Sequence, residues 1–263
     1  MKKLFIIKIG GNVIDETESY ESFLRDFASI DAPRILIHGG GKIATKIGEQ
    51  LGIQSKYING RRITDEQTRD LVTMVYGGLI NRKMVAQLQA LSCNAIGVTG
   101  ADGNLIRASR RPVKEVDFGF VGDVTPEGVN SALLIALLDQ HVVPVFAPLT
   151  LADGEILNTN ADTIASVLAI ALSHHYDVRL IYCFDKKGVL RDVHDDRSVI
   201  AEINKRSYQQ LLTDGVLADG ILPKLENAFS AIDAGVQEIL IGQAKDLLVN
   251  TREETEGTLI RKN

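Results

Sequence analysis

The residues most able to do chemistry begin with a lysine beside two glycines near the start of the chain. Lys8 lies close to the end of the apolar run Leu4–Ile9 and is followed by Gly10 and Gly11. A lysine in a buried strand is costly unless its ammonium group meets an anion or water. Adjacent glycines let backbone N–H groups approach a ligand closely. The pattern indicates an anion-binding turn between a strand and a helix; the alternative is a lysine that reaches solvent before an ordinary turn.

A second glycine run follows the predicted strand Arg34–His38, where Gly40 and Gly41 open a predicted helix. Helix N-termini present backbone N–H groups to anions. The run does not match the phosphate-binding GxxxxGK[ST] loop, because no Ser or Thr follows Lys42, and it lacks GxGxxG spacing. Ligands of open α/β sheets bind at the carboxyl ends of parallel strands, so two such turns predict a binding site there.

Two further side chains are candidates for binding or catalysis. Arg62, within Asn59–Thr64, could present its guanidinium group to a carboxylate, although a solvated basic loop is an equally open interpretation. Asp162 would lie in the first turn of a predicted helix Thr163–Leu172, which Asn160 could cap. Because the helix dipole favours an acid there, Asp162 is either a functional carboxylate or a first-turn acid.

Alternating strand-like and helical patterns must position these candidates, and they predict parallel βαβ units. The further predicted strands are Ala95–Val98, Val142–Ala147, Val178–Phe184 and Glu238–Ile241, with Gly257–Ile260 as an edge strand and Leu105–Val124 as a hairpin or flap. The further predicted helices are Ser19–Ser29, Lys42–Leu51, Glu66–Tyr76, Asn81–Leu91, Asn130–Leu138, Ser207–Thr213 and Leu225–Ala234.

Composition narrows the class of protein. The 263 residues are 45% hydrophobic and 24% charged, which suits a soluble α/β protein with a full core. A net charge of −5 without a lysine or arginine block argues against nucleic-acid binding. Cys93 and Cys183 have apolar neighbours and no CxxC partner, so we expect buried free thiols. Lys8 interrupts the first apolar run too early for a signal peptide, and no apolar stretch could span a bilayer, which predicts a cytoplasmic protein.

Taken together and in order, the motifs resemble the amino acid kinase family over nearly the whole chain. They are Lys8–Gly11, His38–Gly41, Asn59–Thr64, Asn158–Asp162, Asp185–Leu190, Gly220–Lys224 and Gly257–Thr258. The resemblance implies an α/β fold, a three-layer αβα sandwich around one central, mostly parallel and continuous sheet. It also implies an N-terminal lobe, residues 1–175, for acyl-amino-acid binding and dimerisation. The C-terminal lobe, residues 176–263, would bind ATP.

Within the family, the motifs are most similar to members that use ATP to phosphorylate the side-chain carboxylate of an N-acyl-L-glutamate. The implied substrate is N-acetyl-L-glutamate and the implied product an N-acyl-L-glutamyl 5-phosphate, in arginine biosynthesis. Carried over by position, Lys8 and Lys224 would stabilise the transferring phosphoryl group, and Asp162 would orient both lysines. The implied substrate-binding residues are Gly40, Gly41, Arg62 and Asn158; the implied nucleotide-binding residues are Gly10, Gly11, Asp185, Gly188, Leu190, Val216 and Ala218.

The implied chemistry agrees with these residue types. A side-chain carboxylate with a pKa of about 4.3 is already ionised at neutral pH, so the reaction needs no general base. Catalysis then consists of aligning two anions and stabilising negative charge on the phosphoryl oxygens. Two lysines, backbone N–H groups and a Mg²⁺ ion would supply the positive field. We expect Mg²⁺ to be held mainly by the nucleotide phosphates, with few protein ligands, and we name no residue as a metal ligand.

The sequence departs from the family pattern at two motifs. Phe120 stands where relatives often place a histidine in the flap over the substrate, which leaves a bulkier acyl group, such as succinyl, as an open alternative. Lys186 and Lys187 stand where Val-Pro or Val-Ser is usual, and could add contacts to the nucleotide. The chain also begins directly on its first strand, whereas arginine-inhibited hexameric members carry an extra N-terminal helix. We therefore expect a homodimer without arginine feedback.

The sequence motifs also allow other functions. A glutamate, aspartate or carbamate kinase would share the fold, and a catalytically silent ligand sensor could use the same scaffold. The joint presence of Lys8, Asp162 and Lys224 argues against a sensor, which needs no paired lysines aimed at a phosphoryl group. A nicotinamide dehydrogenase is disfavoured because neither glycine run has GxGxxG spacing.

Overall fold

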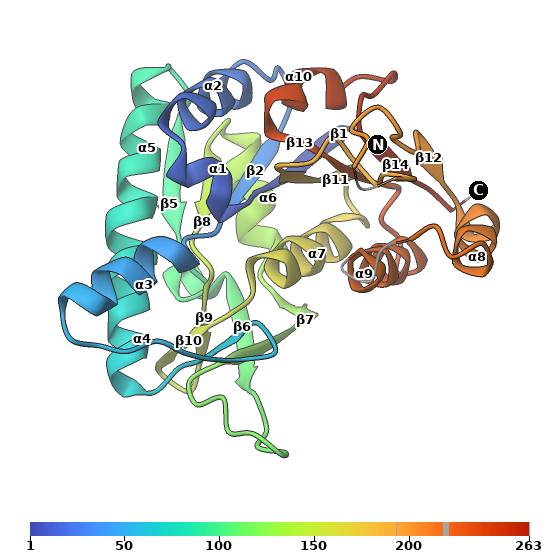
Figure 1. The fold of residues 1–263 in the computed structure, drawn as a ribbon. Helices are drawn as coiled ribbons and strands as arrows, with labels where there is room; N and C mark the ends of the chain where they lie inside the picture. The colour runs from blue at the N-terminus through green and yellow to red at the C-terminus, as the bar shows by residue number, and fades with distance from the viewer. Residues whose placement is uncertain (193, 218–220, 263) are drawn as a thin grey trace. The chain divides into compact units, whose positions relative to one another are not determined.

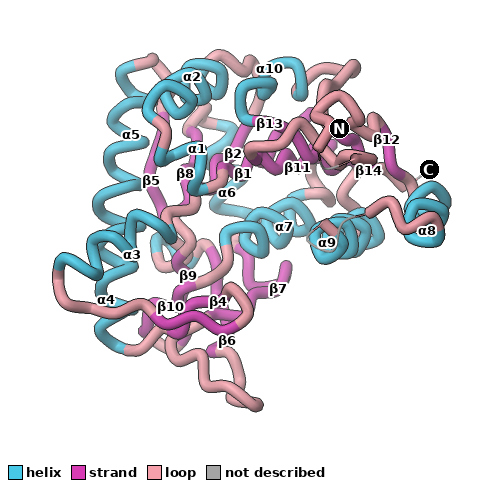
Figure 2. Tube along the Cα trace, viewed as in Figure 1, coloured by secondary structure: helices cyan, strands magenta, loops and turns pink. Residues whose placement is uncertain are grey.

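The computed structural model describes residues 1–192, 194–217 and 221–262, and the chain divides into two compact units. The first unit contains Met1–Arg34 and Leu168–Asn263, and the second contains Ile35–Val167. The first strand groups with the C-terminal part of the chain because β1 (Lys3–Ile9) pairs with β11 (Asp177–Phe184) along its whole length. Figures 1 and 2 show the elements and their order.

A mostly parallel sheet forms the centre of the first unit. Its strand order is β12 (Glu202–Ile203), β14 (Thr258–Ile260), β13 (Glu238–Gln243), β11 and β1. The β1–β11, β11–β13 and β12–β14 pairs are parallel, and the β13–β14 pair is antiparallel. Six of the seven residues of β1 are buried, as expected for a strand that is covered on both faces.

Helices cover the strands of the first unit. They are α1 (Gly11–Asp15), α2 (Thr17–Ala28), α8 (Lys205–Thr213), α9 (Leu222–Asp233) and α10 (Leu247–Asn250), with the short turn η3 (Ala244–Asp246). In α2, the buried side chains Tyr20, Phe23, Leu24 and Phe27 recur at helical spacing and form its apolar face. Helices α9 and α10 both contact β13 and lie on opposite sides of it (Figure 1). Helix α7 (Ala161–Leu172) contributes its residues up to Val167 to the second unit and its last residues, from Leu168, to the first.

The second unit repeats this layering around parallel strands. Strands β2 (Arg34–His38), β8 (Val143–Phe146) and β5 (Ala95–Val98) lie in that order, and both of their pairs are parallel. Helices α5 (Asn81–Ala90) and α6 (Ser131–Asp139) both contact β8. The predicted α/β fold, with helices on both faces of mostly parallel strands, is confirmed in each unit (Figure 2).

Smaller elements complete the second unit. A four-stranded sheet has the order β10 (Glu155–Asn158), β9 (Leu149–Ala152), β6 (Ile106–Arg110) and β7 (Gly122–Val129). The remaining elements are the hairpin β3 (Lys56–Ile58) and β4 (Arg61–Ile63), and the helices α3 (Gly41–Gln50), α4 (Glu66–Val72), η1 (Thr73–Ile80) and η2 (Asp102–Asn104). The antiparallel β6–β7 pair confirms the hairpin predicted within Leu105–Val124.

Two predictions about elements need correction. Strand β14 was expected at the sheet edge, but β12 pairs along its outer side. A strand of two residues such as β12 is too short to leave a periodic pattern in the sequence. Two separate helices were expected between residues 66 and 91, whereas the π-helical segment η1 joins α4 to α5 without a break. Gly77 and Gly78 lie inside η1 and do not end the helix.

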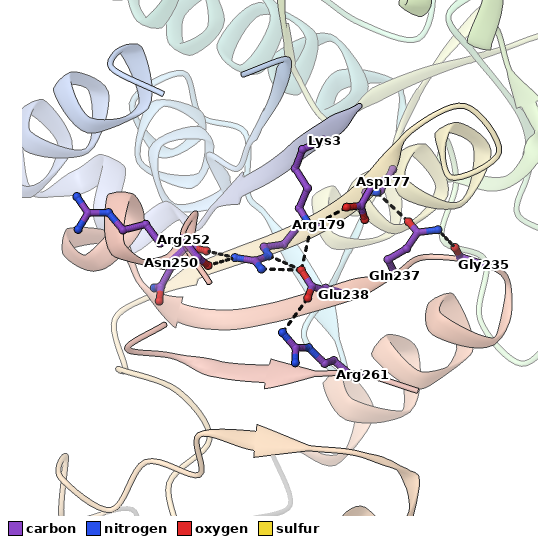
Figure 3. Close-up of polar contacts among 10 residues, drawn as sticks. Lys3, Asp177, Arg179, Gly235, Gln237, Glu238, Asn250, Arg252 and Arg261 are labelled. Atoms are coloured by element: carbon purple, nitrogen blue, oxygen red, sulfur yellow. Dashed lines mark hydrogen bonds and ion pairs between the residues drawn. The ribbon is translucent and has the colours of Figure 1, made fainter. Parts of the chain in front are cut away.

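An ion-pair network joins the amino ends of the strands in the first unit (Figure 3). Arg179 on β11 is 4% exposed, and its Nη2 lies 2.6 Å from Oε2 of Glu238 on β13. Lys3 on β1 pairs with Glu238 at 3.0 Å and with Asp177 at 3.2 Å, and Arg261 reaches the other oxygen of Glu238 at 2.9 Å. The network fixes the strand ends opposite to those that carry the predicted site.

Both cysteines are buried free thiols, as predicted. Burial raises the pKa of the Cys183 thiol to about 12, although the positive charge of Lys8 acts in the opposite direction. In the described ranges of the chain, none of the helices has the length and apolar character needed to cross a membrane.

Candidate active site

Two lysines that lie far apart in the sequence converge on one aromatic ring in the first unit. The Nζ atom of Lys8 lies 5.2 Å from the ring centroid of Phe184, and the Nζ atom of Lys224 lies 3.7 Å from the same centroid. Lys8 is 8% exposed and is the last residue but one of β1. The structure therefore brings together the two residues that were predicted to stabilise a transferring phosphoryl group.

The position of Lys224 in its helix favours a functional explanation. Helix α9 begins at Leu222, which places Lys224 in its first turn. A cation there is opposed by the helix dipole, so the lysine does not stabilise the helix. Together with the N–H groups of that turn, its ammonium group instead makes this end of α9 electropositive.

The first glycine turn has the predicted geometry. The backbone N–H of Gly10 donates to the carbonyl oxygen of Cys183 over 3.2 Å, which fastens the end of β1 to β11. Helix α1 begins at Gly11, and no side chain caps it. A Cβ atom added to Gly11 would have no neighbour within 4 Å. The strand–glycine–helix turn is confirmed; a nucleotide role for Gly10 and Gly11 stays a prediction.

The turn that follows β11 packs on the last strand of the first unit. The side chain of Gln243 donates to the carbonyl oxygen of Asp185 over 2.9 Å. A Cβ atom on Gly188 would lie 2.6 Å from Oγ1 of Thr258, so only glycine fits there. The Thr258 hydroxyl accepts a hydrogen bond of 2.8 Å from the N–H of Val189, the residue after that glycine. These contacts fix the shape of the turn.

The other predicted nucleotide-binding residues lie on two short segments. Leu190 is buried and forms an antiparallel bridge with Val199. Val216 follows α8, and its N–H donates to the carbonyl oxygen of Leu211 over 3.1 Å. Ala218 lies outside the described residues, as does Gly220 of the Gly220–Lys224 motif. The nucleotide roles of Asp185, Gly188, Leu190, Val216 and Ala218 stay predictions.

The two lysines that depart from the family pattern have acidic neighbours. Lys186 lies 3.1 Å from Asp196, and Lys187 lies 3.7 Å from Glu256. Both pairs are exposed to solvent, so each contributes little to stability. A contact of either lysine with nucleotide stays a prediction.

The predicted substrate-binding residues Arg62 and Gly41 meet in the second unit. Arg62 is 7% exposed, and its Nη2 donates to the carbonyl oxygen of Gly41 over 2.8 Å and to Oγ1 of Thr45 over 2.9 Å. Its Nη1 donates to the hydroxyl of Ser55. The guanidinium plane is thus held beside the start of α3, and the interpretation of Arg62 as part of a solvated basic loop is wrong.

A tyrosine that the sequence analysis missed completes the support of Arg62. The guanidinium carbon lies 4.9 Å from the ring centroid of Tyr57, because Tyr57 and Arg62 are directly paired across the β3–β4 hairpin. The turn between the strands is Asn59-Gly60, both with positive φ, at 49° and 73°. Asn-Gly between two short strands is a strong hairpin signal, and it could have predicted this pairing.

Gly40 must be glycine for conformational and steric reasons. Its φ is 156°, and a Cβ atom would collide with the side chains of Ile80 and Tyr76 on η1. Tyr76 is near Arg62 as well: burial raises the pKa of the tyrosine, and the charge of Arg62 partly offsets that rise. Gly40, Gly41 and Arg62 therefore form one cluster around the beginning of α3.

A buried, neutral histidine supports the same glycine turn. Burial lowers the pKa of His38 to about 4, against the opposing hydrogen bond with Gly39. Its Nδ1 lies 2.8 Å from the Gly39 carbonyl oxygen, and its Nε2 lies 3.2 Å from Nδ2 of Asn81. The Asn81 amide also donates to the carbonyl oxygen of Val145 over 2.9 Å. Since the amide donates to Nε2, the histidine proton is on Nδ1 and points to the Gly39 carbonyl.

Asn158 is hydrogen-bonded to the predicted flap, Leu105–Val124, and to Thr64. The Asn158 amide donates to Oγ1 of Thr64 over 3.0 Å, and its backbone N–H donates to the carbonyl oxygen of Phe120 over 2.9 Å. The Phe120 ring lies 4.5 Å from the guanidinium carbon of Arg69 and 4.4 Å from that of Arg110. The flap is therefore held against the segment that carries Asn158, and Phe120 has its own cationic partners.

Asp162 lies in the first turn of α7, as predicted, and is half-buried. The cap is Asn160, whose Oδ1 accepts a hydrogen bond of 3.0 Å from the N–H of Thr163. Lys8 and Lys224 belong to the first unit and Asp162 to the second. Its role in orienting the two lysines stays a prediction.

Comparison with known proteins defines the class. The model of the amino acid kinase family matches residues 3–243, so the chain belongs to that family. It is a kinase with ATP as co-substrate and small molecules as its substrates.

Two curated proteins and one solved structure show which members of the family this chain is similar to. An acetylglutamate kinase of Bacteroides thetaiotaomicron is 55% identical over 262 residues, with 99% of both chains covered. An acetylglutamate kinase of Cytophaga hutchinsonii is 53% identical over 266 residues, with 100% of both covered. The carbamate kinase from Giardia lamblia bound to AMP-PNP has a TM-score of 0.71 at 17% identity, with 100% of this chain and 99% of that chain covered, and shares the fold. The two acetylglutamate kinases, which are more than 50% identical over the full chain, do not favour the N-succinyl, glutamate, aspartate, carbamate or sensor alternatives.

Proposed function

We propose that this chain transfers the γ-phosphoryl group of ATP to the side-chain carboxylate of N-acetyl-L-glutamate, giving N-acetyl-L-glutamyl 5-phosphate for arginine biosynthesis. The observation that carries the reaction type is the convergence of Lys8 and Lys224 on the ring of Phe184. The names of relatives that are more than 50% identical over the full chain support the substrate.

The lysine pair suits phosphoryl transfer to a carboxylate. Both reactants are anions, and negative charge is spread over the phosphoryl oxygens in the transition state. Two ammonium groups near one point oppose the repulsion between the reactants and stabilise that charge. The substrate carboxylate is already ionised at neutral pH and attacks without a general base. We assign the transfer step to Lys8 and Lys224, with Asp162 as the carboxylate that orients them.

We assign the N-acyl amino acid to the residues of the second unit. Arg62 would bind the α-carboxylate, since its guanidinium plane is fixed by Gly41, Thr45 and Ser55 and is pre-organised for a carboxylate. Backbone N–H groups of Gly40 and Gly41 would bind anionic oxygens at the start of α3, where no side-chain cap is present. Asn158 would hydrogen-bond the amide end of the substrate.

We assign ATP to the first unit. The Asp185–Leu190 turn, with Val216 and Ala218, would contact the nucleotide, and Gly10 and Gly11 would bind phosphate oxygens. Within the described residues no group of three or more His, Cys, Asp and Glu side chains could hold a metal ion. We propose that a Mg²⁺ ion would be held chiefly by nucleotide phosphates and water, where it would neutralise charge on the phosphate oxygens.

The assembly and the location of the enzyme follow as further proposals. Met74 and Leu79 on η1 and Ile96 on β5 are large apolar side chains between 40% and 56% exposed in the second unit. The exposure of these side chains supports a homodimer in which the second unit takes part. Light scattering tests the dimer, and activity measured with added arginine tests the expected lack of feedback. We propose a cytoplasmic location for the enzyme, because its co-substrate ATP is present there.

A hydroxylamine-trapping assay tests the reaction. Acyl phosphates react with hydroxylamine to give hydroxamates, so ATP-dependent hydroxamate formation reports the product directly. N-acetylglutamate, N-succinylglutamate, glutamate and aspartate are compared at equal concentrations. We expect turnover of N-acetylglutamate above that of the other three. Preferred turnover of N-succinylglutamate would overturn the acyl group, and preferred turnover of a free amino acid would overturn the substrate class.

A further inference from the structure

The ring of Phe184 has an unusual position, because two ammonium groups lie over it. Phe184 is the last residue of β11. The Nζ atoms of Lys8 and Lys224 lie 5.2 and 3.7 Å from its centroid, so the two nitrogens are no farther apart than the sum of these distances. Both distances are within the range of cation–π contacts.

Strand register explains why Lys8 reaches this ring. In the parallel β1–β11 pair, Lys8 is opposite Tyr182. Side chains at paired positions of neighbouring strands share a face, and residues two apart in one strand share it too. Lys8, Tyr182 and Phe184 therefore project from the same face of the sheet. The rings of Tyr182 and Phe184 are stacked, with centroids 6.1 Å apart and planes 18° apart, which limits the orientation of Phe184.

An aromatic ring face suits a pair of lysines. Two ammonium groups of like charge repel each other, and Lys8 is almost wholly removed from water. Lys224 is also in the first turn of α9, where the helix dipole opposes a cation. The negative face of an aromatic ring attracts cations without carrying a net charge. It can therefore attract both ammonium groups without neutralising their charge.

We propose that Phe184 is a positioning residue of the kinase reaction, whose aromatic face holds Lys8 and Lys224 together so that both act on the transferring phosphoryl group. This inference rests on the proposed function of the two lysines. Phe184 itself touches no reacting atom; it acts through the lysines that lie over it.

Fluorination of the ring tests the proposal without changing its shape. Phenylalanine with one, two and three ring fluorines is placed at position 184, which withdraws electron density from the ring face in steps. We expect kcat for N-acetylglutamate to fall with each fluorine, to about tenfold below the unmodified enzyme with three. The same series at Phe23 is the control. That ring is fully buried and stacks on Phe27 in the same unit, and within the described part of the chain its only ring contact is with Phe27.

Ordinary substitutions separate the aromatic face from the filled volume. We expect Phe184→Tyr to keep kcat within about threefold and Phe184→Leu to lower it by about tenfold or more. A ring that only fills space predicts a flat fluorine series at Phe184, and that result would overturn the proposal. Because fluorination retains the packing, a folding defect in Phe184→Leu does not remove this test.

The design separates this proposal from the proposed function. Turnover of N-acetylglutamate by the unmodified enzyme tests the function and does not depend on Phe184. If the unmodified enzyme fails to turn over any substrate, calorimetric binding of ATP is measured across the same fluorine series. Affinity that falls with each fluorine supports the positioning of the lysines on phosphate. Constant affinity in that case refutes it.

Discussion

Lys8 and Lys3 lie near opposite ends of β1 and offer a matched pair of substitutions to methionine. Methionine keeps most of the apolar stem of lysine and removes its charge. Lys8 faces Phe184 at the predicted site, whereas Lys3 pairs with Asp177 and Glu238 at the other end of the strand. If the site has been placed correctly, one substitution impairs catalysis and the other impairs stability.

For Lys8→Met we expect a loss of about 10²–10³ in kcat, or roughly 2.7–4 kcal/mol of transition-state stabilisation. Its stability should stay within about 1 kcal/mol of the unmodified protein. The lost cation–π contact, worth about 1 kcal/mol, is offset because an almost buried ammonium group near a second one is removed. Hydroxamate formation measures kcat, and urea unfolding measures stability.

For Lys3→Met we expect the opposite result. Its side chain is 32% exposed, so losing two partly screened ion pairs should cost about 1 kcal/mol of stability and leave kcat unchanged. The assignment of the site would be refuted by a well-folded Lys8→Met enzyme whose kcat lies within tenfold of the unmodified one. It would also be refuted if Lys3→Met lowered kcat as strongly as Lys8→Met.

Three further predictions follow from other parts of the molecule. Arg62→Lys should raise the KM for N-acetylglutamate about 10- to 100-fold with little change in kcat, because a lysine cannot reproduce the fixed guanidinium fork; steady-state kinetics measures this. Glu238→Gln should cost about 3 kcal/mol at pH 7, since it leaves Arg179 buried without its carboxylate. Burial alone would raise the pKa of Glu238, but its hydrogen bonds and ion pairs with Lys3 and Arg179 lower it below 4.5; the stability it provides is present above that value and is lost as the pH falls through the lowered pKa. The free energies of unfolding of the unmodified protein and of Glu238→Gln should therefore converge at low pH. A difference that stays constant with pH would contradict the assignment of this stability to the Glu238 carboxylate. Asp65→Ala should cost about 1 kcal/mol, because Asp65 caps α4 by accepting from the N–H of Thr68, whereas Asp65→Asn should cost much less; equal losses in urea unfolding would argue against the cap.

The regular elements could be predicted where short apolar runs end at turn residues. Arg34–His38 and Ala95–Val98 have the same bounds in the sequence prediction and in the structure, since glycines or polar residues stand directly beside them. Asn160 was recognised as a possible cap because its side chain precedes a helical pattern, and it accepts the hydrogen bond expected of a cap. These features depend on neighbouring residues only.

The contacts that assemble the site depend on residues far apart in the chain. The approach of Lys8 to Phe184 follows from the β1–β11 register, and no local pattern specifies which residues of two distant strands are paired. The resemblance of motifs identified Lys8, Lys224 and Arg62, but it gave no indication of Phe184. The burial of Arg62 could not be predicted either, since it results from contacts with α3 and with the paired strand of its hairpin.

The burial of both cysteines has a practical consequence for spectroscopy. Cys93 and Cys183 are buried, and with its pKa raised to about 12 the Cys183 thiol is almost entirely protonated at neutral pH. Because thiolates are the species that react with maleimide dyes, the natural cysteines should label slowly in the folded protein. A single cysteine introduced on the surface of each compact unit could then carry a fluorophore with little background. Energy transfer between two such dyes would follow the separation of the units while nucleotide and the phosphoryl-acceptor substrate bind. The residues of the catalytic centre would remain unmodified in this experiment.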